Sequence, residues 1–217
     1  MLVELPSDIK RQVDKGILIL KEGGIVAFPT DTVYGLGAAA NNPQAVARVY
    51  VVKERPRHMP LPLLLAHTLQ ISEVAEPVPP LAWLLAERFL PGALTLVLSK
   101  SRSVPDIVTA GGTTVAVRIP AHPVPVALVE GLGVPILGTS ANLSGRPSIL
   151  EAGEVYSQFS GRIAMVIDGG RCPGGRESTI VDVTGKVPVV LREGAITVAE
   201  LECASGARFK RLGRDRK

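Results

Sequence analysis

Aromatic residues are scarce in this chain, at 4% of 217 residues, so Leu, Val, Ile and Ala must supply its core. The two cysteines, Cys172 and Cys203, lack CxxC spacing, which excludes a zinc site of that kind and a disulfide framework. No apolar run approaches the roughly 18 residues that a membrane-spanning helix needs. The first ten residues have none of the features of a signal peptide. We therefore expect a cytoplasmic protein with two free thiols and no membrane contact.

Several catalytic motifs are also missing. There is no GxxxxGK[ST] loop, and residues 138–141 do not form a GxSxG elbow. Residues 35–40 match GxGxxA loosely, but the next helix is expected to begin only at Asn42–Pro43, too late to point its N-terminus at a pyrophosphate. The histidines lack metal-ligand spacing, and no Ser–His–Asp set or carboxylate pair is visible. We expect neither a protein-held metal nor a covalent nucleophile.

The net charge of +4 is concentrated at the C-terminus. Residues 205–217 contain six Lys or Arg and one Asp, which is +5. The other 204 residues therefore carry 4 − 5 = −1, so the positive charge does not mark a basic nucleic-acid-binding domain. Two interpretations of residues 205–217 stay open: a flexible, solvated tail and an arm that contacts RNA.

Hydrophobic periodicity predicts strands that alternate with helices. Hydrophobic residues make up 46% and charged residues 20%, as is typical of globular domains. The last two predicted strands flank Thr184–Gly185 and are expected to form a hairpin, so the sheet should be mixed. The sequence thus indicates a single α/β domain over residues 1–204, with a twisted mixed sheet flanked by helices. Strands are predicted at residues 25–28, 63–66, 94–98, 115–119, 134–137, 163–167, 180–183 and 187–191, and helices at about 8–22, 42–55, 79–90, 123–131, 148–158 and 197–203.

Two of the helix starts carry capping signals. Ser7 and Asp8 are candidates to cap the first helix, which should end at the two glycines that follow it. Asn42 followed by Pro43 is a typical N-cap and first-turn proline. That second helix must end near Arg55, because a residue that precedes proline disfavours the α conformation.

The segment GIVAFPTDTVYGLG, residues 24–37, narrows the function most. Its buried run ends at Pro29 and opens into hydroxyls, an acid and a phenol. In open α/β sheets, ligands bind at such strand ends. An ordinary turn has the same composition, so this segment alone does not decide between the two. The side chains concerned are Thr30, Asp31, Thr32 and Tyr34.

Cations mark two further segments. Lys53, Arg55 and Arg57 follow the second helix, where the helix dipole alone would favour them, but they also suit a clamp for nucleotide phosphates. Arg118 lies in an apolar strand run and needs an anionic partner. That partner is either an internal Asp or Glu, or a ligand.

Two later segments add polar groups. Residues 135–145 are a buried strand that opens into the small polar run TSANLSG, which suits a phosphate or ribose as well as a plain turn. Residues 191–194 are a strand end, LREG, with Arg192 beside an acid. Together these segments predict a site of cations, hydroxyls and backbone amides without a nucleophile. Such a site positions and neutralises a phosphoryl group.

Taken together, the motifs resemble the YrdC/Sua5 family, the L-threonylcarbamoyladenylate synthases. Seven family motifs stand in order over about 165 residues, with Ala93 departing from the usual second proline. Their positions are Pro29–Gly37, Lys53–Pro56 with Pro60–Leu61, Pro91–Leu98, Val115–Pro120, Thr139–Gly145, Ser178–Asp182 and Leu191–Gly194.

The resemblance implies a fold and a reaction. The fold is a single domain around a large concave cavity. The reaction joins L-threonine, bicarbonate or CO2, and ATP into threonylcarbamoyl-AMP and releases pyrophosphate. The product is the donor for the t6A modification at tRNA position 37, so the implied partners include the downstream t6A transferase machinery, with possible tRNA contact through the basic tail. Mg2+ is expected to accompany ATP.

The resemblance also implies residue roles. Catalytic roles fall to Lys53 and Arg55. Threonine would be held by Thr30, Arg118, Gly138 and Thr179, with Arg118 facing its carboxylate. ATP would be held by Lys53, Arg57, Thr114, Ser140, Asn142, Ser148 and Arg192. Substitution of Lys53 by Ala is expected to abolish turnover with little loss of fold.

The chain resembles the short form of the family, so a second domain and a linker that closes the site are not expected. Two alternatives remain. A hydrogenase-maturation carbamoyltransferase contains a similar domain, but the missing CxxC pairs and the length argue against it. A non-catalytic RNA-binding module is disfavoured by the charge of −1 outside the tail.

Overall fold

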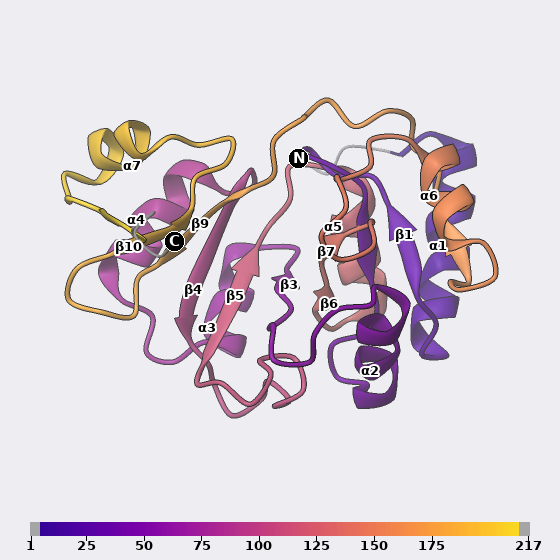
Figure 1. Cartoon of the computed structure of the whole chain (residues 1–217), viewed down its shortest axis with the longest axis horizontal. Coiled ribbons are helices and arrows are strands. Elements are labelled where there is room, and N and C mark those ends of the chain that lie inside the picture. Colours follow the sequence, from indigo (N-terminus) through magenta and orange to yellow (C-terminus); the bar gives the residue numbers. More distant parts are fainter. Residues whose placement is uncertain (1–4, 213–217) are drawn as a thin grey trace.

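The computed structural model describes residues 5–212, in which helices and strands alternate as expected (Figure 1). The helices are α1 (Ser7–Lys21), α2 (Pro43–Val52), η1 (Thr68–Gln70), α3 (Ile71–Val74), α4 (Pro80–Phe89), α5 (Pro123–Leu132), α6 (Ala152–Phe159) and α7 (Val198–Ser205). The strands are β1 (Val26–Phe28), β2 (Gly35–Gly37), β3 (Leu63–Leu64), β4 (Leu94–Ser99), β5 (Thr114–Arg118), β6 (Ile136–Leu137), β7 (Thr139–Ser140), β8 (Met165–Val166), β9 (Thr179–Asp182), β10 (Val189–Arg192) and β11 (Lys210–Arg211).

The strands form two sheets rather than the single one expected. A four-stranded sheet has the order β7-β2-β1-β8, and a seven-stranded sheet has the order β11-β10-β9-β4-β5-β3-β6. Both contain parallel and antiparallel pairs, so the prediction of mixed pairing is confirmed. The predicted hairpin is also confirmed, because β9 and β10 pair antiparallel. In Figure 1, β4, β5, β9 and β10 lie on one side of the molecule and β1 and β7 on the other.

The chain passes from one sheet to the other at Gly138. This residue separates β6, the last strand of the large sheet, from β7 at the edge of the small one. Its N–H donates to the carbonyl oxygen of Pro62 at 2.9 Å. A Cβ at this position would lie 2.2 Å from the side chain of Leu64, so the crossover has room only for glycine.

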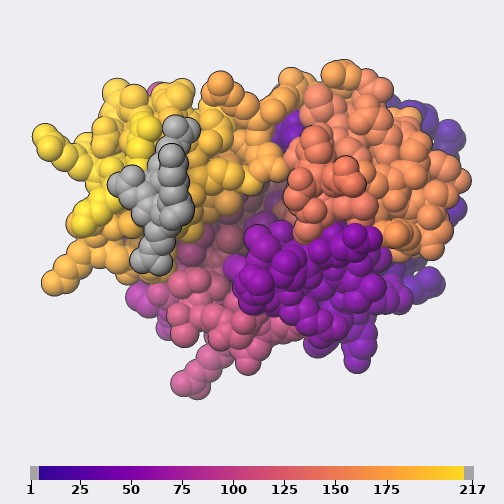
Figure 2. Space-filling model, in the orientation of Figure 1, coloured from indigo at the N-terminus to yellow at the C-terminus, as the bar shows by residue number. Residues whose placement is uncertain are grey.

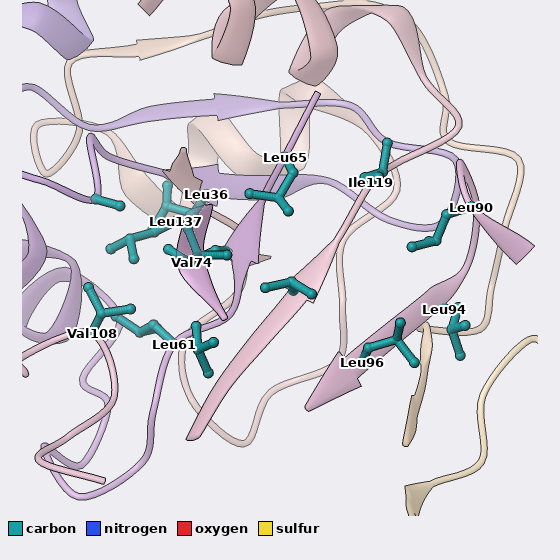
Figure 3. Packing of buried hydrophobic residues seen from close by; sticks show 14 of the residues in the cluster. Leu36, Leu61, Leu65, Val74, Leu90, Leu94, Leu96, Val108, Ile119 and Leu137 are labelled. Atoms are coloured by element: carbon teal, nitrogen blue, oxygen red, sulfur yellow. The ribbon is translucent and has the colours of Figure 1, made fainter. Parts of the chain in front are cut away.

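Two hydrophobic clusters cover the sheets. Val26 and Phe28 on β1 face a cluster with residues of α1 and α5, whereas Ala27 between them faces the larger cluster, as the two-residue period of a strand requires. Figure 3 shows part of the larger cluster, in which Leu36 of the small sheet, Leu137 of the large sheet and Val74 of α3 lie close together. Aliphatic residues dominate it, in keeping with the scarcity of aromatic ones.

The capping predictions had different outcomes. The side chain of Asn42 accepts a hydrogen bond from the N–H of Ala45 at 3.0 Å, which confirms this cap. The predicted cap at Ser7 or Asp8 is wrong, because the N-cap residue is Pro6 and no side chain caps α1. Ser7 is already the first helical residue, so its hydroxyl lies past the N-cap position.

The first residues of the predicted basic tail are part of the fold. The predicted boundary at residue 204 falls within α7, and β11 then pairs in parallel with β10. Phe209, which lies between α7 and β11, is buried. Residues 213–217 of the tail lie outside the described residues.

Candidate functional site

The predicted motifs meet where strands from both sheets end. The turn after β1 contacts Arg118 at the end of β5, and Arg192 at the end of β10 is close enough for its charge to lower the pKa of Arg118. Glu177, just before β9, in turn raises the pKa of Lys53 against the effect of burial. Residues far apart in sequence therefore form one group of charges.

Thr30 organises the turn that follows β1. Its hydroxyl donates to the carbonyl oxygen of Val33 at 2.7 Å and accepts from the N–H groups of Thr32 and Val33. It also hydrogen-bonds the hydroxyl of Thr32, and both threonines are buried. This is the local hydroxyl-to-backbone pattern of Ser/Thr turns. The turn presents Asp31 and Thr32 to the end of β5.

Arg118 is held by three hydrogen bonds. Its Nε donates to the carbonyl oxygen of Gly92 at 2.9 Å, its Nη1 to the hydroxyl of Thr32 at 3.0 Å, and its Nη2 to Oδ1 of Asp31 at 2.7 Å. Burial lowers the pKa of Arg118, and the carboxylate of Asp31 opposes that shift. The internal acid that the sequence left as one alternative is therefore present, and it is Asp31.

Lys53 fastens the TSANLSG loop to the end of α2. Its ammonium donates to the carbonyl oxygens of Ser140 and Asn142, and its own carbonyl accepts from the N–H of Ser144 at 2.9 Å. Only 1% of Lys53 is exposed, and burial lowers its pKa to about 8. In Figure 2 the purple segment that includes α2 lies against the salmon and orange segments that follow β6. Substitution by Ala would leave the buried carbonyl oxygen of Asn142 without a donor, whereas that of Ser140 keeps the N–H of Asn142 at 2.9 Å, so the geometry argues against little loss of fold.

A second network joins Ser148 to Arg192. The hydroxyl of Ser148 donates to Glu177 at 2.7 Å, and the other carboxylate oxygen of Glu177 pairs with Arg192. Arg192 also donates to the carbonyl oxygen of Ser178 at 2.9 Å. Two of the predicted nucleotide residues are thus linked through one acid.

Three predicted residues lie elsewhere. Arg55 donates to the carbonyl oxygens of Met59 and Pro60 and so fixes its own loop. Arg57 is exposed and lines a separate pocket of about 240 Å³. Thr114 begins β5 while Arg118 ends it, which places the two about 13 Å apart along the strand. The structure therefore does not bring these three together with Arg118.

Two of the remaining predicted residues have structural contacts of their own. The hydroxyl of Thr179 is fully buried and bonds the backbone of Gly194 and Ile196, so it anchors the turn after β10. Gly138 is the crossover between the sheets. Asn142 differs: its amide nitrogen donates to two carbonyls, but its buried Oδ1 finds no hydrogen-bond partner in residues 5–212.

Tyr34, from the first motif, belongs to the core. Its phenol is fully buried and donates to the carbonyl oxygen of Gly170 at 2.8 Å. Burial raises the pKa of Tyr34 to about 12, so the phenol stays protonated at neutral pH. Its contacts are those of a structural residue.

The sequence did not assign roles to two acids of the site. Asp31 stood in the first motif but had no partner, and the only signal was that Arg118 needed an anion. Glu177 had no signal beyond being an acid next to a predicted strand. Both carboxylates are paired with arginines. Within residues 5–212 no group of three or more His, Cys, Asp or Glu is placed to hold a metal ion.

Comparisons with known proteins identify related chains. The Sua5_yciO_yrdC family model, described as telomere recombination, matches residues 18–194. A threonylcarbamoyl-AMP synthase of Pyrococcus abyssi is 46% identical over 187 residues, 86% of this chain and 55% of that protein. The Bacillus subtilis threonylcarbamoyl-AMP synthase is 44% identical over 196 residues, 90% of this chain and 57% of that protein. The chain spans little more than half the length of these relatives.

A solved structure gives the same result for the fold. The crystal structure of P. abyssi Sua5 complexed with L-threonine aligns with a TM-score of 0.90 at 43% sequence identity. The alignment covers 95% of this chain and 60% of that one. The α/β fold predicted from the motifs is confirmed, whereas the large concave cavity stays a prediction.

Proposed function

The chain belongs to the Sua5/YciO/YrdC family, and we propose that it joins L-threonine, bicarbonate or CO2, and ATP into L-threonylcarbamoyl-AMP and releases pyrophosphate. The observation that carries this proposal is the alignment of 86% and 90% of the chain with proteins named for that activity. The matched region contains all seven motifs, and Lys53, Arg118 and Arg192 of the site come from them.

Arg118 is the proposed anchor for the threonine carboxylate. Three of its five N–H groups bond Gly92, Thr32 and Asp31, and two remain. A guanidinium with two remaining N–H groups can donate both to a further carboxylate. Thr30 supports this role by fixing the turn that carries Asp31 and Thr32, and Gly138 and Thr179 support it by fixing the backbone nearby.

The nucleotide is proposed to bind along Ser140, Asn142, Ser148 and Arg192. Lys53 holds the backbone of the first two and adds a positive charge beneath them. Arg192 is exposed and faces one carboxylate, so phosphate oxygens can compete for its donors. Arg57 and Thr114 are the outer positions of the proposed ATP site, and Arg55 shapes the loop between Lys53 and Arg57.

The reaction needs positioning more than covalent help from the protein. The threonine ammonium first loses a proton to solvent, and the neutral amine then attacks the carbon of CO2 and loses a second proton, which gives a carbamate. A carbamate oxygen then attacks the α-phosphorus, and the bond from that phosphorus to the bridging oxygen breaks, so pyrophosphate leaves. Both reactants are anions that repel each other, so cations that hold them in line lower the barrier.

Mg2+ is proposed to enter with ATP rather than to occupy a protein site. The two carboxylates of the site, Asp31 and Glu177, each pair with an arginine, and the other polar groups are cations, hydroxyls and carbonyls. This donor set does not fit a dedicated magnesium cage, which needs carboxylates and water in octahedral geometry. The phosphates themselves would hold the ion.

We further propose that the product serves t6A formation on tRNA, with the downstream t6A transferase machinery as partner, and that the protein is cytoplasmic. Over residues 5–212, none of the helices has the length and apolar content to cross a bilayer. Direct tRNA contact through residues 205–217 is the remaining partner proposal. It should be tested by substitutions at exposed Arg208 and Lys210, because truncation would also remove buried Phe209.

Pyrophosphate release from ATP tests the activity. We expect release only when L-threonine and bicarbonate are both present. Release without threonine, or no release at all, would contradict the proposal. An Arg118→Gln variant should lower threonine affinity at least tenfold, because it loses the charge that faces the carboxylate.

A further inference from the structure

Asp31 has hydrogen-bonding capacity that its contact with Arg118 does not use. Its Oδ1 accepts from Nη2 of Arg118 at 2.7 Å, and 15% of its side chain is exposed. Its Oδ2 accepts no hydrogen bond from any residue in 5–212, and it is not sealed from solvent. A carboxylate has about four acceptor sites. Asp31 can therefore bind a second donor without leaving Arg118.

The charges around Asp31 leave Arg118 as its counterion. Burial lowers the pKa of His122, whose Nδ1 accepts from the N–H of Val124, so this imidazole is neutral at pH 7 and carries its proton on Nε2. Burial raises the pKa of the Cys172 thiol, so this group is also uncharged. One further cation beside Asp31 would thus meet a negative charge that is only partly neutralised.

Stability alone does not explain the Asp31–Arg118 pair. Ten per cent of the Arg118 side chain is exposed, so both charges lie largely out of water. Such pairs are often no more stabilising than apolar residues of the same size, because desolvation offsets the attraction. The pair nevertheless places one positive and one negative group side by side, each with capacity for a further hydrogen bond.

We propose that Asp31 and Arg118 together bind an α-amino acid as its zwitterion, Arg118 taking the carboxylate and Asp31 the ammonium. An α-amino acid carries both groups on one carbon, so its recognition requires opposite charges next to each other. This inference rests on the proposed function and assigns Asp31 as the residue that orients the reacting nitrogen. It also makes the amine a requirement for binding, separate from the hydroxyl and the carboxylate.

The test compares two ligands that differ only in the amine. L-Threonine and (R)-3-hydroxybutyrate share the carboxylate, the hydroxyl and the methyl group. Isothermal titration of the full chain should give at least tenfold tighter binding of threonine, and Asp31→Asn should weaken threonine binding about 10- to 100-fold. The same variant should change 3-hydroxybutyrate binding by less than threefold. Asp14→Asn, at an exposed ion pair on α1, is the matched control and should change neither.

Each other outcome has a definite meaning. Equal binding of the two ligands by the unaltered chain overturns the proposal without any variant, so the test does not depend on Asp31→Asn folding. If Asp31→Asn weakens both ligands equally, Asp31 only positions Arg118. If the unaltered chain releases pyrophosphate and binds threonine but Asp31→Asn is silent, this inference fails and the proposed function stands. If the unaltered chain does neither, the proposed function itself fails.

Discussion

Lys53 shows how one side chain can serve both the fold and the chemistry. It is a nearly fully buried cation whose hydrogen bonds go to two carbonyl oxygens, and no acid in residues 5–212 forms an ion pair with it. The sequence grouped Lys53 with Arg55 and Arg57, either as an anion clamp or as cations that the helix dipole favours. In the structure the three cations diverge, because each donates to, or lies near, a different loop.

The lowered pKa of Lys53 makes stability depend on pH. Between about pH 8 and the ordinary lysine value of 10.5, the unfolded chain keeps the proton that the folded chain has lost. The free energy of unfolding should therefore rise with pH across this window, and the contribution is lost as pH falls through 8. Urea unfolding at pH 7, 8.5 and 10 should show the rise in the wild type and not in Lys53→Met. Parallel profiles would mean that the pKa of Lys53 is ordinary.

Arg118 shows what the sequence can and cannot predict about the contacts of a single residue. The apolar strand around it predicted that it needs an anion, and the structure supplies Asp31. The partner lies 87 positions away, so no local pattern could identify it. Lys53 is likewise 87 positions from Ser140 and 89 positions from Asn142, so the sequence could not predict these contacts either.

At the scale of elements, most strands and helices were predictable, including short ones such as β3 and β8, whereas β2, β7 and β11 were not predicted. The predicted strand at residues 94–98 is β4, and the predicted helix at 123–131 is α5. In contrast, β2 consists of Gly35, Leu36 and Gly37, which show no strand pattern and extend only because β1 and β7 pair with them. The division into two sheets has the same cause, since it depends on pairing between distant segments.

The crossover at Gly138 gives a prediction for these elements. Gly138→Ala should lower the free energy of unfolding by about 1–3 kcal/mol, because the added methyl overlaps the side chain of Leu64. Gly153→Ala in α6 is the matched control: its Cβ meets no atom within 4 Å, so it should be neutral or stabilising by up to about 1 kcal/mol. Chemical denaturation measures both. Equal effects would show that the crossover can relax.

At the scale of the whole molecule, charge composition was a poor guide to the C-terminal segment. Residues 205–217 were expected to be a separate tail because basic residues gather there. Strand β11 and the buried ring of Phe209 lie within that segment, and Arg211 pairs with Glu193 beside β10. A single aromatic residue among cations did not stand out in the composition.

Phe209 tests whether this segment belongs to the cooperative fold. Phe209→Ala should lower the free energy of unfolding by about 3 kcal/mol, as for other buried aromatic rings. Leu212→Ala, whose side chain is 64% exposed, should change it by less than about 0.5 kcal/mol. Thermal or urea unfolding of the two variants compares them directly. A silent Phe209→Ala would favour the flexible-tail interpretation.

The one-residue link between β6 and β7 also limits how the molecule can move. The segment after β2 strengthens this junction, because the N–H of Leu137 donates to the carbonyl oxygen of Ala38 and the N–H of Ala40 to that of Pro135, so relative motion of the two sheets would hinge along this line. Ser140, two residues beyond Gly138, would move least, and Arg192, on the fifth strand away from β6 in the large sheet, would move farther. A substrate that binds at both Ser140 and Arg192 would therefore bind only at certain angles between the two sheets.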